Sequence, residues 1–122
     1  MQRENGNVRT TETDLVLDVE QLRTLTLNDP RLMREILLAL IEDTSRQASL
    51  LADALRDRDP GRLGRLARSS ARACDNLGAY RGAGVLRSIE RGAASADYPA
   101  CRAAMESLKA EFERLAAEVA AL

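Results

Sequence analysis

The chain of 122 residues contains no histidine and no tryptophan, and aromatic residues make up only 2% of it. The missing histidine excludes Ser-His-Asp and Cys-His catalysis, imidazole metal ligands, phosphohistidine chemistry and an imidazole pH switch. With so few aromatics, the core must be built from Leu, Ile, Val, Met and Ala. Cys74 and Cys101 are too few for a disulfide framework, so we expect them to be small core hydrophobes.

Long hydrophobic runs are also missing. The longest uncharged apolar run, Ile36 to Ile41, is far shorter than a membrane span. Residues 1–14 are polar and lack an apolar signal core, so we expect a disordered tail there and a single domain over 15–122. We therefore expect a cytoplasmic protein with no membrane partner.

The residues that do dominate, Ala, Leu, Arg and Glu, favour helices, and no segment alternates with a period of two. The fold class predicted is all-α. Asp18, Asp29-Pro30, Asp59-Pro60 and Asp97-Tyr98-Pro99 are typical helix starts, and Gln21 completes a capping-box pattern with Asp18. These signals predict helices over about 18–27, 30–57, 60–79, 82–95 and 98–121.

Apolar residues recur at helical spacing in every predicted helix. In the last helix they form a heptad seam of Cys101, Met105, Leu108, Phe112, Leu115, Val119 and Leu122. A seam can mark a coiled-coil dimer, but beside three other amphipathic helices an intramolecular bundle is favoured. The architecture predicted is a short leading helix followed by an antiparallel four-helix bundle.

Charge is unevenly distributed along the chain. Residues 56–91 hold nine arginines against four carboxylates, whereas the whole chain has a net charge of −1. A basic surface of this kind fits an acidic protein partner or an ordinary solvated face. No aromatics are interleaved with the arginines and no DNA-binding motif is present, so we expect no nucleic-acid partner.

Motifs that would carry catalysis or bind a cofactor are absent. Gly82-Ala83-Gly84 follows no strand, which argues against a phosphate loop. A di-iron bundle needs histidines, two distant cysteines make a poor zinc site, and no nucleophile has a base beside it. We expect a protein that is not an enzyme and has no metal or cofactor. We expect the remaining carboxylates, including Glu42, Asp43, Glu111 and Glu113, to lie on helix surfaces.

One stretch is more informative. Residues 66–79 read Leu-Ala-Arg-Ser-Ser-Ala-Arg-Ala-Cys-Asp-Asn-Leu-Gly-Ala, which resembles the core motif of histidine-containing phosphotransfer (HPt) domains, Leu-Ala-His-Ser-Leu-Lys-Gly-Ser-Ala-x-Asn-Leu-Gly-Ala. The matching positions, in register and without gaps, are Leu66, Ala67, Ser69, Asn76, Leu77, Gly78 and Ala79. Flanking similarity, such as Val85, Ile89 and Glu90 downstream, extends the resemblance over about residues 18–122. It implies an HPt-like helical bundle, which agrees with the periodicity.

The departures from that motif fall where the family places its phosphoryl site. Arg68 stands where the resemblance implies the phospho-accepting histidine, Ala71 where a lysine is common, and Arg72 where a small glycine is found. Arginine is always protonated near neutral pH and is no nucleophile. The resemblance therefore implies a degenerate member, a pseudo-HPt protein that carries no phosphate.

The resemblance also implies a docking surface for a response-regulator receiver domain or a histidine kinase. Arg68 would pair with the receiver's carboxylates bidentately or displace its magnesium ion, and Gly64 would leave room for a partner's backbone. An alternative for the arginines is an ordinary solvated helix face, with Arg72 paired to Asp75 three residues on. The candidate partner-binding residues are Gly64, Arg65, Arg68, Ala71, Arg72 and Asp75.

The function predicted is a non-catalytic adaptor or competitive inhibitor in two-component signalling. We expect a monomer, with a dimer left open. One alternative is a structural helical module that dimerises or scaffolds other partners through its C-terminal helix. Another is a true relay protein whose acceptor has been replaced, but the concurrent changes at Ala71 and Arg72 argue against a single substitution.

Overall fold

A computed structural model of the chain describes residues 15–122, and the tail predicted for 1–14 lies outside the described residues. The described part is all helical. Its helices are α2 (Val19–Leu25), α3 (Pro30–Arg56), α4 (Pro60–Asn76), α5 (Tyr80–Ala94) and α6 (Tyr98–Ala120). The predicted helices are confirmed with boundaries shifted by a few residues.

Aspartates begin four of the five described helices. The carboxylates of Asp18, Asp29, Asp59 and Asp97 each accept backbone N–H groups of the first turn that have no partner within the helix. A proline in the first turn of α3, α4 and α6 adds the fixed φ that a helix start needs. The four predicted aspartate N-caps are therefore confirmed.

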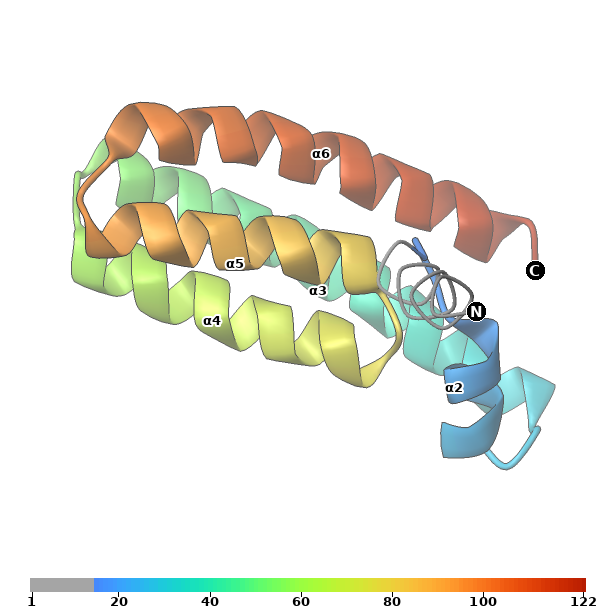
Figure 1. Cartoon of the computed structure of the whole chain (residues 1–122). Helices are drawn as coiled ribbons and strands as arrows, with labels where there is room; N and C mark the ends of the chain where they lie inside the picture. The colour runs from blue at the N-terminus through green and yellow to red at the C-terminus, as the bar shows by residue number, and fades with distance from the viewer. Residues whose placement is uncertain (1–14) are drawn as a thin grey trace, which may run out of the picture.

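Helices α3 to α6 form the bundle, and each lies antiparallel to the next along the chain (Figure 1). Helix α3 packs against α4 and α6, and α5 packs against the same two, with the most extensive contact between α4 and α5. Helices α4 and α6 lie diagonally across the bundle, and their backbones are not in close contact. This arrangement confirms the predicted four-helix bundle with a short leading helix.

The core is aliphatic, as the scarcity of aromatics requires. Fully buried leucines and Ile89 fill it, with Cys74 and Cys101 as buried free thiols. Burial and, secondarily, Asp43 raise the pKa of the Cys74 thiol to about 12, against a smaller opposing effect of Arg87. Burial and Asp97 likewise raise the pKa of Cys101. Both thiols are therefore protonated and unreactive near neutral pH, as the core interpretation expects.

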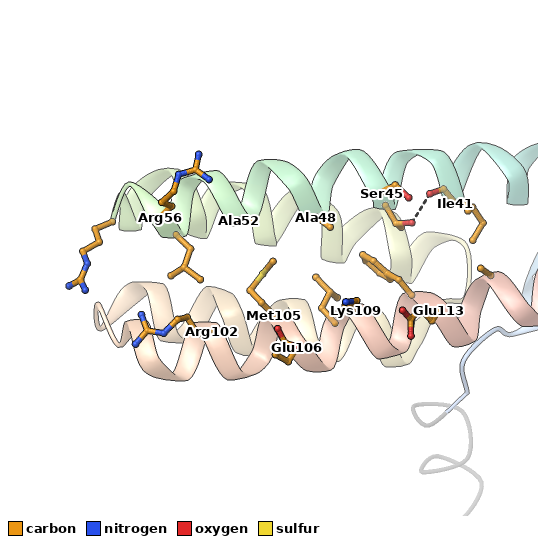
Figure 2. A pocket seen from close by; sticks show the side chains of 16 residues that line it. Ile41, Ser45, Ala48, Ala52, Arg56, Arg102, Met105, Glu106, Lys109 and Glu113 are labelled. Atoms are coloured by element: carbon orange, nitrogen blue, oxygen red, sulfur yellow. Dashed lines mark hydrogen bonds between the residues drawn. The ribbon is translucent and has the colours of Figure 1, made fainter.

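The predicted seam of α6 is used mainly inside the molecule. Cys101, Leu108, Leu115 and Val119 are buried in the bundle, whereas Leu122 is 54% exposed. Met105 and Phe112 are half-buried and line a groove between α3 and α6 of about 910 Å³ (Figure 2). The heptad spacing is thus explained mostly by packing within one chain.

Three details differ from the expectations. The spacing of Val19, Leu22 and Leu25 predicts one apolar side for the leading helix, but Leu25 is 52% exposed because α2 ends there, and only Leu22 is fully buried. Helix α5 begins at Tyr80 rather than near residue 82, and Gly82 lies buried within it. Glu111, expected on a helix surface, is only 8% exposed because it lies between Leu108 and Leu115 on the buried face.

Helix α2 is attached to the turn between α4 and α5. The Gln21 side chain donates hydrogen bonds to the carbonyl oxygens of Asp75 and Asn76 at the end of α4, at 2.9 and 2.8 Å. The Tyr80 hydroxyl donates to Asp18 at 3.2 Å. Only the Asp18 half of the predicted capping box forms, because the Asp18 N–H donates to the Gly78 carbonyl instead of to the Gln21 side chain.

Candidate functional site

The candidate site is the solvent-facing side of α4. Leu63, Ala67 and Cys74 of this helix are fully buried, which fixes its rotation in the bundle. Residues three and four positions apart share a face of a helix, so Arg65, Arg68 and Arg72 project together to solvent, and all three are exposed. The structure therefore places these three arginines on one surface, as the sequence predicted. We call these three residues the arginine face.

Arg68 lies at the centre of this face, and its side chain is 57% exposed. Its Nε donates to Oε2 of Glu90 on α5 over 2.7 Å. Within residues 15–122 its two terminal Nη groups make no hydrogen bond or ion pair. Glu90 thus holds one edge of the guanidinium and leaves the other edge available for a carboxylate or a phosphoryl group.

Asp75 is held by α5 rather than by its own helix. Arg87 donates to the Asp75 carboxylate, so the alternative pairing of Arg72 with Asp75 does not form. Among the described residues Arg72 and Arg65 form no ion pair. The net charge presented by this side of α4 is therefore positive, with Asp75 already neutralised at its edge.

Two candidate residues lie elsewhere than expected. Ala71 is only 3% exposed, so little of its side chain is accessible for the partner contact expected of it. It shares the buried face with Ala67 and Cys74, and these small side chains let α4 and α5 approach closely. Gly64 is half-buried and faces α5, where an added Cβ would lie 3.8 Å from Ala93. Part of the space that Gly64 was expected to offer a partner is therefore occupied by α5.

The motif residues that match the HPt pattern have structural roles. Gly78 adopts φ +84°, and its carbonyl accepts from the Asp18 N–H at 2.8 Å. A Cβ at this position would come within 2.9 Å of the Asp18 Cβ. The glycine therefore provides both the left-handed turn and the close approach of the leading segment. Leu77-Gly78-Ala79 thus forms the α4–α5 turn and holds the leading segment against it.

A second group of charges lies between α5 and α6, and it was not predicted from the sequence. Arg81 binds the buried Glu111 carboxylate bidentately, with distances of 2.9 and 2.8 Å, and Arg114 adds a third bond at 2.8 Å. The hydrogen bond from Arg81 lowers the pKa of Glu111, against the opposing effect of burial, and the positive charges of Arg81 and Arg114 add to the lowering. The signal in the sequence was the position of Glu111 on the apolar stripe of α6.

Neither a metal centre nor a membrane-spanning helix is found in the part of the chain that the structure describes. No three Cys, Asp or Glu side chains within 15–122 converge as metal ligands would. Over the same range, none of the helices combines the length and apolar character needed to cross a bilayer.

Comparison with known proteins places the chain in the fold class of histidine-containing phosphotransfer proteins. The crystal structure of histidine-containing phosphotransfer protein B (HptB) from Pseudomonas aeruginosa PAO1 superimposes with a TM-score of 0.80. The likeness covers 87% of this chain and 92% of that one at 23% identity, so it establishes the fold. No protein-family model matches the chain, and no curated protein matches it significantly.

Proposed function

We propose that this chain is a non-catalytic pseudo-phosphotransfer protein of two-component signalling. It binds a response-regulator receiver domain, or a histidine kinase, through the arginine face of α4 and carries no phosphate. The observation that carries the proposal is the position of Arg68. It is exposed at the middle of α4 in an HPt-like bundle. It stands where the sequence motif that residues 66–79 resemble has the acceptor histidine.

The chemistry of arginine supports binding in place of transfer. A guanidinium stays protonated near neutral pH, so it has no lone pair with which to attack a phosphoryl group. Its planar donors match a carboxylate bidentately, and the edge of Arg68 that faces away from Glu90 retains such donors. A receiver's acidic pocket would meet a fixed cation here.

Electrostatics supports an acidic partner. Arg65 and Arg72 flank Arg68 without ion pairs of their own within the described residues. Charges in this arrangement raise the association rate with an acidic surface, and added salt screens that effect. We expect association to slow as salt rises, with a smaller change in the dissociation rate.

The test is calorimetric titration of a panel of purified receiver domains with the wild-type protein and with Arg68→Glu. Arg34→Glu is the matched control, because Arg34 is exposed on α3 and forms no ion pair within 15–122. We expect Arg68→Glu to abolish binding of the cognate receiver and Arg34→Glu to leave it unchanged. Equal affinity of wild type and Arg68→Glu would refute docking through this face.

Absence of phosphate transfer is checked separately. The wild-type protein is incubated with a radiolabelled phosphorylated receiver, and we expect label to remain on the receiver. Acid-labile label on this chain would contradict the non-catalytic assignment.

A further inference from the structure

The exposed edge of α6 carries charges that no other part of the described chain neutralises. Arg102, Glu106, Lys109 and Glu113 alternate in sign and are all exposed. Their spacing of four, three and four residues aligns them in one stripe along the helix. Figure 2 shows the four side chains following one another along α6. We call them the charged stripe of α6.

This stripe forms no ion pair within residues 15–122. That is unexpected, because Glu106 and Lys109 are three apart with the acidic residue first, a spacing and order at which helical ion pairs form. Elsewhere in the same chain, Arg23, Arg46 and Arg56 do pair with carboxylates three residues away.

The order of the charges is self-complementary. Arg102 and Glu113 are equally distant from the point between Ser107 and Leu108, and so are Glu106 and Lys109. A two-fold axis through that point would place a second α6 antiparallel to the first. Arg102 would then lie opposite Glu113 of the partner subunit, and Glu106 opposite Lys109 of the partner subunit. All four charges of each copy would be paired, as an isologous interface requires.

The flanks of the stripe suit the same arrangement. On the side toward α3 lie the half-buried Met105 and Phe112, at the groove between α3 and α6. A two-fold axis brings like flanks together, so Met105 would adjoin Phe112 of the partner subunit and the exposed apolar surface would be covered. On the other flank, the alanines at 103, 110 and 117 are short enough to let the two helices approach.

From the unpaired, palindromic charges and the adjoining apolar groove, we infer that a second copy of this chain binds along α6, forming an antiparallel two-fold dimer. The N-terminal segment 1–14 is a poor alternative occupant of the groove, because its only strongly apolar residues are Met1 and Val8. This inference does not depend on the proposed function, because α4 and α6 lie on opposite sides of the bundle (Figure 1).

The experiment is sedimentation equilibrium of the full chain over a range of concentrations, with two charge reversals. Arg102→Glu sets two glutamates opposite each other at each end of the dimer, and Glu113→Arg sets two arginines there. We expect either variant alone to weaken the dimer by about tenfold or more, because symmetry makes each change count twice. An equimolar mixture of the two variants restores opposite charges at both ends, so we expect it to recover dimerisation near the wild-type level.

Thermal melts of each variant provide the folding control, since the stripe is solvent-exposed and its reversal should leave the melting temperature within a few degrees of wild type. A wild-type protein that sediments as a monomer at every concentration would overturn the inference. So would a dimer unaffected by either reversal, or a mixture that stays as monomeric as the two separate variants.

Discussion

At the scale of single residues, Arg68 is not a free cation but one held by a neighbour. The Glu90 carboxylate binds its Nε at 2.7 Å and therefore competes with an acidic partner for the same guanidinium. Both side chains are partly exposed, at 57% and 30%, so the pair is screened by water and its contribution is small. If the arginine face binds an acidic partner as proposed, Glu90 would lower that affinity without blocking the contact.

Removing the charge of Glu90 should strengthen docking. We expect Glu90→Gln to raise the affinity for the cognate receiver by about two- to fivefold, the range that corresponds to an exposed ion pair of up to about 1 kcal/mol. Titration calorimetry measures it, with the exposed Glu42→Gln on α3 as the control for a change in net charge. An unchanged affinity in Glu90→Gln, beside lost binding in Arg68→Glu, would show that the internal pair does not compete.

Glu111 gives a residue-scale prediction on stability. Because two arginines bind its buried carboxylate, Glu111→Gln should lower the free energy of unfolding at pH 7 by about 2 kcal/mol. The folded-state pKa lies below the ordinary value of 4.5, so this stabilisation is complete above 4.5. It is lost as pH falls through the lower folded value.

Urea unfolding of wild type and Glu111→Gln at a series of pH values measures this effect. We expect the difference to narrow below pH 4.5, and Glu118→Gln, an exposed change on the same helix, to stay close to wild type throughout. A difference that stayed constant down to the acid limit would mean that the carboxylate charge is not the source of the stabilisation.

At the scale of helices, the sequence predicted a helix start correctly where a side chain of the first turn itself stabilises that start. Helices α3, α4 and α6 begin at Asp-Pro or Asp-x-Pro signals because the carboxylate and the proline act within the first turn. Helix α5 begins at Tyr80 without a side-chain cap, so its start could not be read from the sequence. The burial of Ala71 follows from how closely α4 packs against α5. Because alanine is common on both the buried and the exposed side of a helix, the sequence could not predict that burial.

The glycines of α5 test how tightly that helix is packed. A Cβ at Gly92 would lie 2.8 Å from the Cys101 sulfur, whereas a Cβ at Gly84 would meet nothing within 4 Å. We expect Gly92→Ala to destabilise the fold by about 1–3 kcal/mol through overpacking. Gly84→Ala, at an exposed helical position, should stabilise it by up to about 1 kcal/mol through helix propensity. Thermal unfolding of the pair measures both, and equal shifts of the same sign would contradict the packing of α5 on α6.

At the scale of the whole molecule, the bundle separates two surfaces of different character. The arginine face of α4 is positively charged, and too few carboxylates lie near it to neutralise it. The charged stripe of α6 has no net charge, and its order of charges is complementary to itself. The two helices lie diagonally across the bundle, with α3 and α5 between them (Figure 1). The receiver contact and the dimer contact that we propose would therefore not overlap, so one copy could make both at the same time.

The separation of these surfaces predicts the size of the assembly. If both contacts form, mixing the wild-type chain with its cognate receiver should give a complex of two copies of each, because every dimer exposes two arginine faces. Arg102→Glu should reduce the complex to one copy of each while the affinity per chain stays within about twofold of wild type, since distant sites contribute independently. Arg68→Glu should do the reverse and leave a dimer without receiver.

Light scattering coupled to size-exclusion chromatography distinguishes these masses. A receiver affinity that fell together with dimerisation in Arg102→Glu would show that the two surfaces are coupled and that docking requires the dimer.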